Sequence, residues 1–139
     1  MANKDNNTYQ ATTHEIMVEV TPRFLNDQSD PALPRYVWAY DVAITNKGKR
    51  TVQLRERSWT IVDANGQTEN VHGPGVVGEQ PILNPGDAFR YSSGCPLTTP
   101  SGFMSGRYHM QDEAGERFDV DIPAFSLDLP QVRPQRSLN

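Results

Sequence analysis

Three glycines at the spacing of a phosphate-binding loop are the most suggestive chemical feature of this sequence. Gly73, Gly75 and Gly78 form a Gly-x-Gly-x-x-Gly pattern, which in dinucleotide-binding proteins lets the backbone approach a pyrophosphate. That chemistry needs a helix directly after the last glycine, with its N-terminus facing the phosphates. Here Pro81 and Pro85 follow instead, without helical periodicity. The pattern therefore predicts a glycine-rich connection between sheets, with a backbone nest for an anion as the alternative.

Residues typical of catalysis or metal binding are scattered along the chain. His14, His72 and His109 lack the short spacing of a metal site, so the sequence predicts no metal ligands and no cofactor. Cys95 is the single cysteine and is followed directly by a proline, and no nucleophile elbow is present. We therefore expect no catalytic residues and no enzymatic activity.

The elements that must position these residues are short β-strands. Apolar and polar residues alternate over residues 16–20, 36–44, 52–61, 89–91, 104–110 and 118–122, and no segment has a helical period. A change of phase between Leu54 and Trp59 predicts a β-bulge near Glu56-Arg57. The pattern predicts an all-β fold with almost no helix, a two-sheet antiparallel β-sandwich of fibronectin type III-like (Ig-like) topology. A small closed barrel is the alternative.

The turn Glu113-Ala-Gly115 predicts a specific hairpin register. A three-residue loop ending in a left-handed glycine places His109 opposite Asp119 and Arg107 opposite Asp121. Such opposite-charge pairs contribute roughly 0.2–1 kcal/mol each, in the case of histidine only when it is protonated. The two carboxylates are therefore expected to be surface partners rather than acid–base catalysts.

Length and charge limit the classes of partner. The 139 residues fit one domain, predicted at residues 13–129 between flexible tails at 1–12 and 130–139. A net charge of −4 argues against bulk binding to nucleic acid or to an anionic membrane. The sequence has neither a signal peptide nor the ~20 apolar residues that cross a bilayer. We therefore expect a cytoplasmic protein without a membrane segment.

Several runs of residues resemble the ApaG family of small bacterial proteins. The most specific is Gly73-Pro-Gly-Val-Val-Gly-Glu-Gln-Pro81, followed by Leu83-Asn-Pro-Gly86. The other matching runs are Gln28-Ser-Asp-Pro31, Arg35-Tyr-Val-Trp-Ala-Tyr40, Trp59-Thr-Ile-Val-Asp-Ala-Asn-Gly66, Tyr91-Ser-Ser-Gly94, Leu97-Thr-Thr-Pro100, Gly102-Phe-Met104, Gly106-Arg-Tyr-His-Met110 and Ile122-Pro-Ala-Phe125. The resemblance runs from about residue 14 to about residue 130 and implies the same fibronectin type III-like sandwich.

The same resemblance implies a cytoplasmic protein of poorly defined activity, linked to cobalt and magnesium tolerance. Related eukaryotic domains look like interaction modules, and the family's glycine motif is associated with pyrophosphate binding. Many members carry Ser-Arg-His-Trp where this chain has Glu56-Arg57-Ser58-Trp59. A role of that histidine therefore does not transfer, whereas Arg57 and Trp59 match.

These observations favour a non-enzymatic binding module. The candidate ligand-binding residues are Gly73, Gly75, Gly78, Arg57 and Trp59, and the expected partner is a protein or a small anionic ligand. The alternative is a nucleotide- or pyrophosphate-binding protein that uses the Gly73–Gly78 loop with a divalent cation; direct cobalt or magnesium binding is a third hypothesis. Exposed sheet edges also make a homo-oligomer conceivable.

Overall fold

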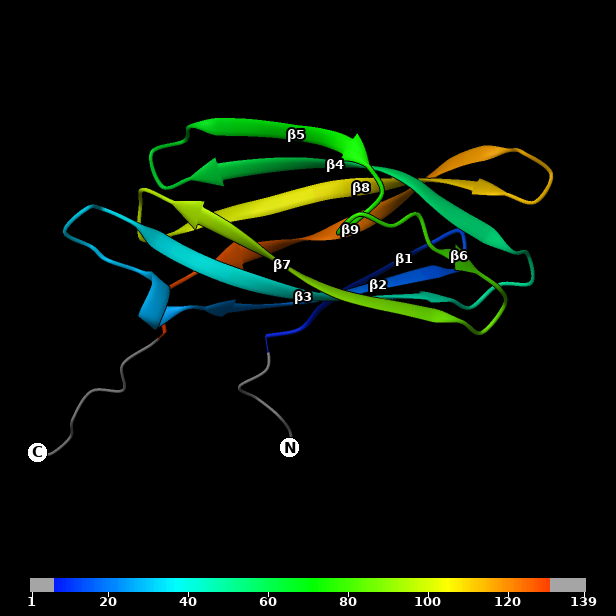
Figure 1. Ribbon diagram of the computed structural model, residues 1–139, viewed down its shortest axis with the longest axis horizontal. Helices are drawn as coiled ribbons and strands as arrows, with labels where there is room; N and C mark the ends of the chain where they lie inside the picture. The colour runs from blue at the N-terminus through cyan, green and yellow to red at the C-terminus, as the bar shows by residue number, and fades with distance from the viewer. Residues whose placement is uncertain (1–6, 131–139) are drawn as a thin grey trace, which may run out of the picture.

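The computed structural model describes residues 7–130, which are built almost entirely of β-strands (Figure 1). The strands are β1 (Tyr9–Thr13), β2 (Ile16–Phe24), β3 (Tyr36–Asn46), β4 (Val52–Asp63), β5 (Thr68–Pro74), β6 (Ile82–Leu83), β7 (Ala88–Leu97), β8 (Gly102–Asp112) and β9 (Arg117–Leu127). The single helical element among the described residues is a short 3-10 turn, η1 (Asn26–Gln28). The predicted all-β class with almost no helix is confirmed.

The strands form two layers, which Figure 1 shows one above the other. One sheet has the order β1-β2-β3-β7, and the other has the order β5-β4-β8-β9, with β6 also paired to β4. All of the strand pairs are antiparallel. Without β1 and β6, this is the strand order of a fibronectin type III sandwich, as the sequence predicted.

The predicted registers agree closely with the structure. In the β8–β9 hairpin, His109 lies opposite Asp119 and Arg107 lies opposite Asp121. The bulge in β4 falls between Leu54 and Glu56, so the extra residue is Arg55, immediately before the predicted place. It changes the parity of β4, which lets both Leu54 and Trp59 be buried.

Alternate side chains from both sheets fill the space between the layers. Trp38 from β3 and Tyr108 from β8 are among the largest fully buried side chains, together with Phe125 from β9. The indole Nε1 of Trp38 donates a hydrogen bond to the carbonyl oxygen of Asp128 at 2.8 Å, and its ring meets Phe24 edge to face at 5.4 Å. One continuous core therefore joins the two sheets.

Strand β1 corrects the predicted N-terminal boundary. Tyr9–Thr13 forms a strand although the sequence predicted a flexible tail over 1–12 and a domain only from residue 13. The reason is tertiary, because β1 pairs with β2 and also meets β9. The Tyr9 hydroxyl accepts a hydrogen bond from the Ser126 amide at 3.4 Å, and the Thr13 hydroxyl accepts one from the Asp121 amide at 3.2 Å. The remaining tail predictions for 1–6 and 131–139 lie outside the described residues.

A buried carboxylate organises the turn between β8 and β9. One oxygen of Asp112 accepts hydrogen bonds from the amides of Glu116 and Ala114, both at 2.9 Å. The other oxygen pairs with Nη1 of Arg50 at 2.7 Å, and the side chain of Asp112 is only 5% exposed. The Glu116 amide, followed by the Ala114 amide and by Arg50, holds the pKa of the Asp112 carboxyl below its usual range.

Asp112 should therefore stabilise the protein in a pH-dependent way. Its pKa is lower in the folded protein than the value of about 3.9 for an unfolded chain, so its contribution is complete above about pH 4 and is lost as the pH falls through the folded pKa. Asp112→Asn should lower the urea midpoint at pH 7, and the difference from wild type should shrink on acidification. Asp128→Asn, at an exposed position, is the control. A difference that stayed constant with pH would contradict this assignment.

Candidate functional site

The glycine-rich segment runs along one edge of β4. At Gly75 the chain leaves β5 with a φ of +59°, and the Gly75 amide donates to the carbonyl oxygen of Arg55 at 2.9 Å. The segment then reaches β6, which pairs with β4. The prediction of a crossing between sheets is therefore wrong, because β5, β4 and β6 belong to one sheet. The chain crosses to the other sheet only after β6, on its way to β7.

A tight turn follows Gly75. Val76 and Glu79 exchange two backbone hydrogen bonds of 2.8 Å, and the two residues between them, Val77 and Gly78, have positive φ values of 42° and 81°. The side chain of Val76 is buried, whereas Val77 is 55% exposed. A β-branched residue in the left-handed region is strained, so the surrounding contacts must hold Val77 there.

Arg57 fastens this segment to β4. Its Nη1 donates to the carbonyl oxygens of Pro74 and Gly75 at 3.0 and 2.9 Å. A Cβ atom at Gly73 would lie 3.1 Å from the same Nη1, so a glycine there leaves room for the guanidinium. The absence of a side chain at Gly73 thus makes room for Arg57. It does not serve the close approach to a phosphate at a helix N-terminus that the glycine pattern has in dinucleotide-binding proteins.

Three of the predicted binding residues meet at one cavity of about 330 Å³. It is lined by side chains and backbone from both sheets and from the glycine-rich segment: Tyr40, Arg57, Trp59, Pro74, Val76, Val77, Gly78, Tyr91 and Ser93. Arg57, Trp59 and Gly78 therefore lie together, whereas Gly73 and Gly75 shape the loop beside them without lining the cavity. We call this space the Arg57 cavity.

The Arg57 cavity combines one positive charge with neutral polar groups. Among its lining residues, all from the described part of the chain, only Arg57 is charged. Burial raises the pKa of both Tyr40 and Tyr91, so their hydroxyls stay protonated at neutral pH. The Tyr91 hydroxyl also lies 2.5 Å from that of Tyr108. A guanidinium, hydroxyls and aromatic rings together suit an anionic group attached to an apolar body.

Sequence reasoning missed the contribution of β7 to this cavity. Tyr91 and Ser93 face it from the edge of the other sheet, and Tyr40 on β3 also lines it. The alternation of β7 puts Tyr91 and Ser93 on one face. No sequence signal, however, brings that face next to Arg57.

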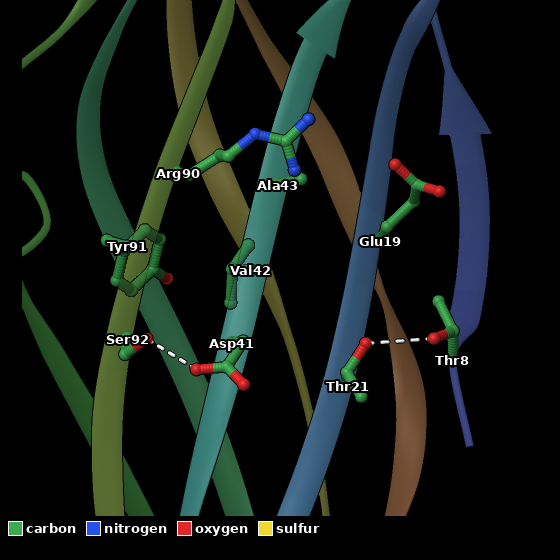
Figure 2. Close-up of a pocket in the computed structure, with 9 residues that line it drawn as sticks. All are labelled: Thr8, Glu19, Thr21, Asp41, Val42, Ala43, Arg90, Tyr91 and Ser92. Carbon is green, nitrogen blue, oxygen red and sulfur yellow. Dashed lines mark hydrogen bonds between the residues drawn. The ribbon is translucent and has the colours of Figure 1, made fainter. Parts of the chain in front are cut away.

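A second hollow, of about 410 Å³, lies on the outer face of the β1-β2-β3-β7 sheet (Figure 2). Its carboxylate Asp41 is bonded by Ser92 and pairs with Arg23 at 3.0 Å, and the Arg23 hydrogen bond keeps the pKa of Asp41 low. The hydroxyl of Thr8, just before β1, and that of Thr21 on β2 form a hydrogen bond of 2.9 Å. Asp41, Thr8 and Thr21 thus already have partners, and the lining also carries charges of both signs, on Glu19 and Arg90. The Arg57 cavity, in which the one charged lining residue is positive, is the better candidate for an anionic ligand.

The single cysteine is held in unreactive surroundings. Burial raises the pKa of the Cys95 thiol to about 11, so little thiolate forms at neutral pH. Over residues 7–130 no cluster of three or more His, Cys, Asp or Glu side chains is arranged to hold a metal ion. Nor does any helix in that range have the length and apolar character needed to span a bilayer.

Comparison with known proteins gives a consistent result. The ApaG domain model matches residues 26–112, which include Arg57, Trp59 and the whole glycine-rich segment. The ApaG protein of Brucella anthropi is 61% identical over 131 residues, covering 94% of this chain and 99% of that protein. The ApaG protein of Paramagnetospirillum magneticum is 58% identical over 91% of this chain and 98% of its own length.

A solved structure has the same fold. The crystal structure of a Bordetella pertussis protein designated ApaA superimposes with a TM-score of 0.83 and 46% sequence identity, covering 87% of this chain and 98% of that one. The resemblance inferred from short runs of sequence thus extends to the whole described domain. With its glycine-rich segment, its sandwich topology and these relatives in agreement, the chain belongs to the ApaG family.

Proposed function

We propose that this protein is a binding module whose Arg57 cavity holds an anionic group, either of a small ligand or of a partner protein, and that it acts there by binding rather than by catalysis. The observation that carries the proposal is the convergence of Arg57, Trp59 and Gly78 on one cavity whose only charge is positive. The link to cobalt and magnesium tolerance, suggested by family resemblance, belongs to this proposal as a consequence of partner binding.

The remaining donors of Arg57 support an anionic ligand. Nη1 is used by the loop carbonyls, but a guanidinium has five N–H donors in a fixed fork. Carboxylate and phosphate groups match that fork, and hydrogen bonds to charged groups contribute about 1.5–3 kcal/mol. The hydroxyl of Ser93 and the ring of Trp59 line the same cavity from the two sheets.

Titration calorimetry tests the proposal with three probes: inorganic pyrophosphate, ATP with and without magnesium, and an acidic peptide. Arg57→Gln should weaken binding of the active probe by roughly 10-fold to 100-fold, because it removes the one charge that faces the anion. Arg90→Gln removes an arginine that lines the outer hollow instead and should leave affinity unchanged. In cells that lack the protein, Arg57→Gln should likewise fail to restore cobalt tolerance.

Equal loss of affinity in the Arg57 and Arg90 variants would contradict the site, because binding would then depend on net charge alone. Failure of all three probes to bind wild type would contradict the anionic ligand. If ATP with magnesium binds and the acidic peptide does not, the nucleotide alternative is correct. One observation favours that alternative, namely the edge-to-face pair of Tyr40 and Trp59 rings, 5.4 Å apart, which gives the cavity an aromatic wall.

A further inference from the structure

A hydrogen-bonded chain of serine, histidine and aspartate crosses the outer face of the β5-β4-β8-β9 sheet. The hydroxyl oxygen of Ser58 lies 2.7 Å from Nε2 of His109. Nδ1 of the same ring lies 2.8 Å from Oδ1 of Asp119. A second histidine, His72, places its Nδ1 2.9 Å from the Ser58 hydroxyl. The Ser58 hydroxyl thus lies between the imidazoles of His72 and His109, and the His109 ring is in turn hydrogen-bonded to the Asp119 carboxylate.

Strand register brings these four residues together. Ser58 on β4 is the partner of His72 on β5, and His109 on β8 is the partner of Asp119 on β9. The two pairs are linked by the pairing of β4 with β8. In that register His109 lies opposite Glu56, the residue two positions before Ser58 on the same strand. Because all four side chains stand on paired strands of one sheet rather than on loops, their geometry is set before any ligand arrives.

The proton positions follow from the partners. An ionised carboxylate only accepts hydrogen bonds, so Asp119 requires the proton of a neutral His109 to be on Nδ1. Nε2 then carries a lone pair, and the Ser58 hydroxyl must donate to it. This is the tautomer in which a histidine can take the proton of a serine, with the carboxylate keeping the ring in that orientation.

Space for a substrate lies beside the serine. A surface cavity of about 560 Å³ is lined by Ser58 together with Thr60, Ser105, Arg107, Ile122 and other residues of β8, β9 and β1. The His109 side chain is 23% exposed and lies behind Ser58, so Ser58 is the member of the chain that lines this cavity. The cavity contains hydroxyls, an arginine and apolar atoms, which suit an uncharged ester better than a polyanion because Asp121 already pairs with Arg107 at 3.3 Å.

We propose that Ser58 is a nucleophile for acyl transfer from carboxylic esters, with His109 as its general base and Asp119 as a positioning residue. In the acylation step a bond forms between the Ser58 oxygen and the ester carbonyl carbon, and the serine proton passes to Nε2 of His109. The bond from carbonyl carbon to leaving oxygen then breaks, and the leaving alcohol takes that proton. Water then attacks the acyl carbon and gives a proton to Nε2 of His109. The bond from the Ser58 oxygen to that carbon breaks, the proton passes to the Ser58 oxygen, and the carboxylic acid is released.

The surroundings of Ser58 predict slow turnover. β4 is paired on both sides, by β5 and β8, so its backbone N–H groups are committed to the sheet and do not form an oxyanion hole. Negative charge on the carbonyl oxygen would be stabilised by side chains, of which Arg107 and His72 are the cross-strand neighbours of Ser58. We therefore expect covalent labelling to be a clearer readout than ester hydrolysis.

A fluorophosphonate probe, followed by mass spectrometry of the labelled peptide, tests the proposal. The serine oxygen bonds to phosphorus, fluoride leaves, and the proton passes to His109. Wild type should be labelled at Ser58, whereas Ser58→Ala should not be labelled. His109→Gln should slow labelling roughly 100-fold, the usual contribution of a general base, and added imidazole should restore part of the rate to His109→Ala. Ser92→Ala, at an exposed serine on β7 of the other sheet, is the matched control and should react like wild type.

Asp119→Asn separates positioning from simple structural support. It should lower the maximal labelling rate while leaving the concentration of probe at half-saturation unchanged, because the ring loses its orientation but the cavity keeps its walls. Arg57→Gln should label normally, and Ser58→Ala should keep anion binding, so failure here and failure of the proposed binding function are distinguishable. Absence of label in folded wild type, or label on another residue, would overturn the proposal.

Discussion

Trp38→Ala is expected to lower the free energy of unfolding by about 3–5 kcal/mol, the range for removal of a buried tryptophan. The ring is 1% exposed, and it packs edge to face on Phe24. The substitution also leaves the carbonyl oxygen of Asp128 without its indole donor. For a domain of this size the melting temperature should fall by roughly 10–15 °C. Urea unfolding followed by circular dichroism measures the free energy of unfolding, and thermal unfolding followed by the same signal measures the melting temperature.

Trp38→Phe is the matched control for this prediction. It keeps an aromatic ring in the core but removes the N–H that reaches Asp128. Its free energy of unfolding should therefore lie between those of wild type and Trp38→Ala. The order wild type, Phe, Ala follows from packing and from one hydrogen bond acting together. A Trp38→Ala protein within about 1 kcal/mol of wild type would contradict the packed core.

Gly75→Val is expected to lower stability and to abolish anion binding together. Gly75 has a φ of +59°, and a Cβ atom there would overlap the carbonyl oxygen of Glu79. The left-handed conformation costs roughly 1–2 kcal/mol for a residue with a Cβ, and forced repacking adds roughly 1–3 kcal/mol. Relief of the overlap must move the turn that carries Val76 and Gly78, and with it one wall of the Arg57 cavity.

Gly86→Val separates the backbone cost from the steric cost. Gly86 also has a positive φ, +90°, but a Cβ there would have no atom within 4 Å. Its stability loss should be limited to the conformational term, and its affinity for the anion should equal that of wild type. Calorimetry and urea unfolding on both variants make the comparison. Equal binding by Gly75→Val and wild type would show that the loop is not part of the site.

Local pattern was sufficient for most of the fold. Alternation and turn residues predicted β2, β3, β4, β7, β8 and β9, the all-β class and the register that pairs His109 with Asp119, because each depends on neighbours close in sequence. The strands β5 and β6, which lack a clear apolar alternation, were not predicted. Strand β1 was missed because Tyr9–Thr13 is stabilised by pairing with β2 and by contacts with β9, more than a hundred residues away in the chain. The bulge lies beside the place predicted near Glu56-Arg57, and its exact position depends on the pairing with β8.

The candidate site was predictable only in part. Arg57, Trp59 and the glycines could be singled out from the sequence, but the reason for Gly73 could not, because the guanidinium that fills its space comes from the neighbouring strand. The wall formed by β7 requires knowledge of how the sheets face each other. The hydrogen-bonded group around Ser58 could be predicted only in part. The turn at Gly66 sets Ser58 opposite His72. His109 joins them through the long-range pairing of β4 with β8.

The walls of the Arg57 cavity come from both sheets, with Tyr91 and Ser93 on one and Arg57 and Trp59 on the other. A bound molecule would therefore contact both sheets at a place where side-chain packing is the main interaction between them. Its free energy of binding would be added to that of folding, by about 2.7 kcal/mol at a ligand concentration of 100 times Kd. Ligands can therefore be screened by the rise they cause in the melting temperature, because a molecule in the cavity contacts both sheets and stabilises the folded state.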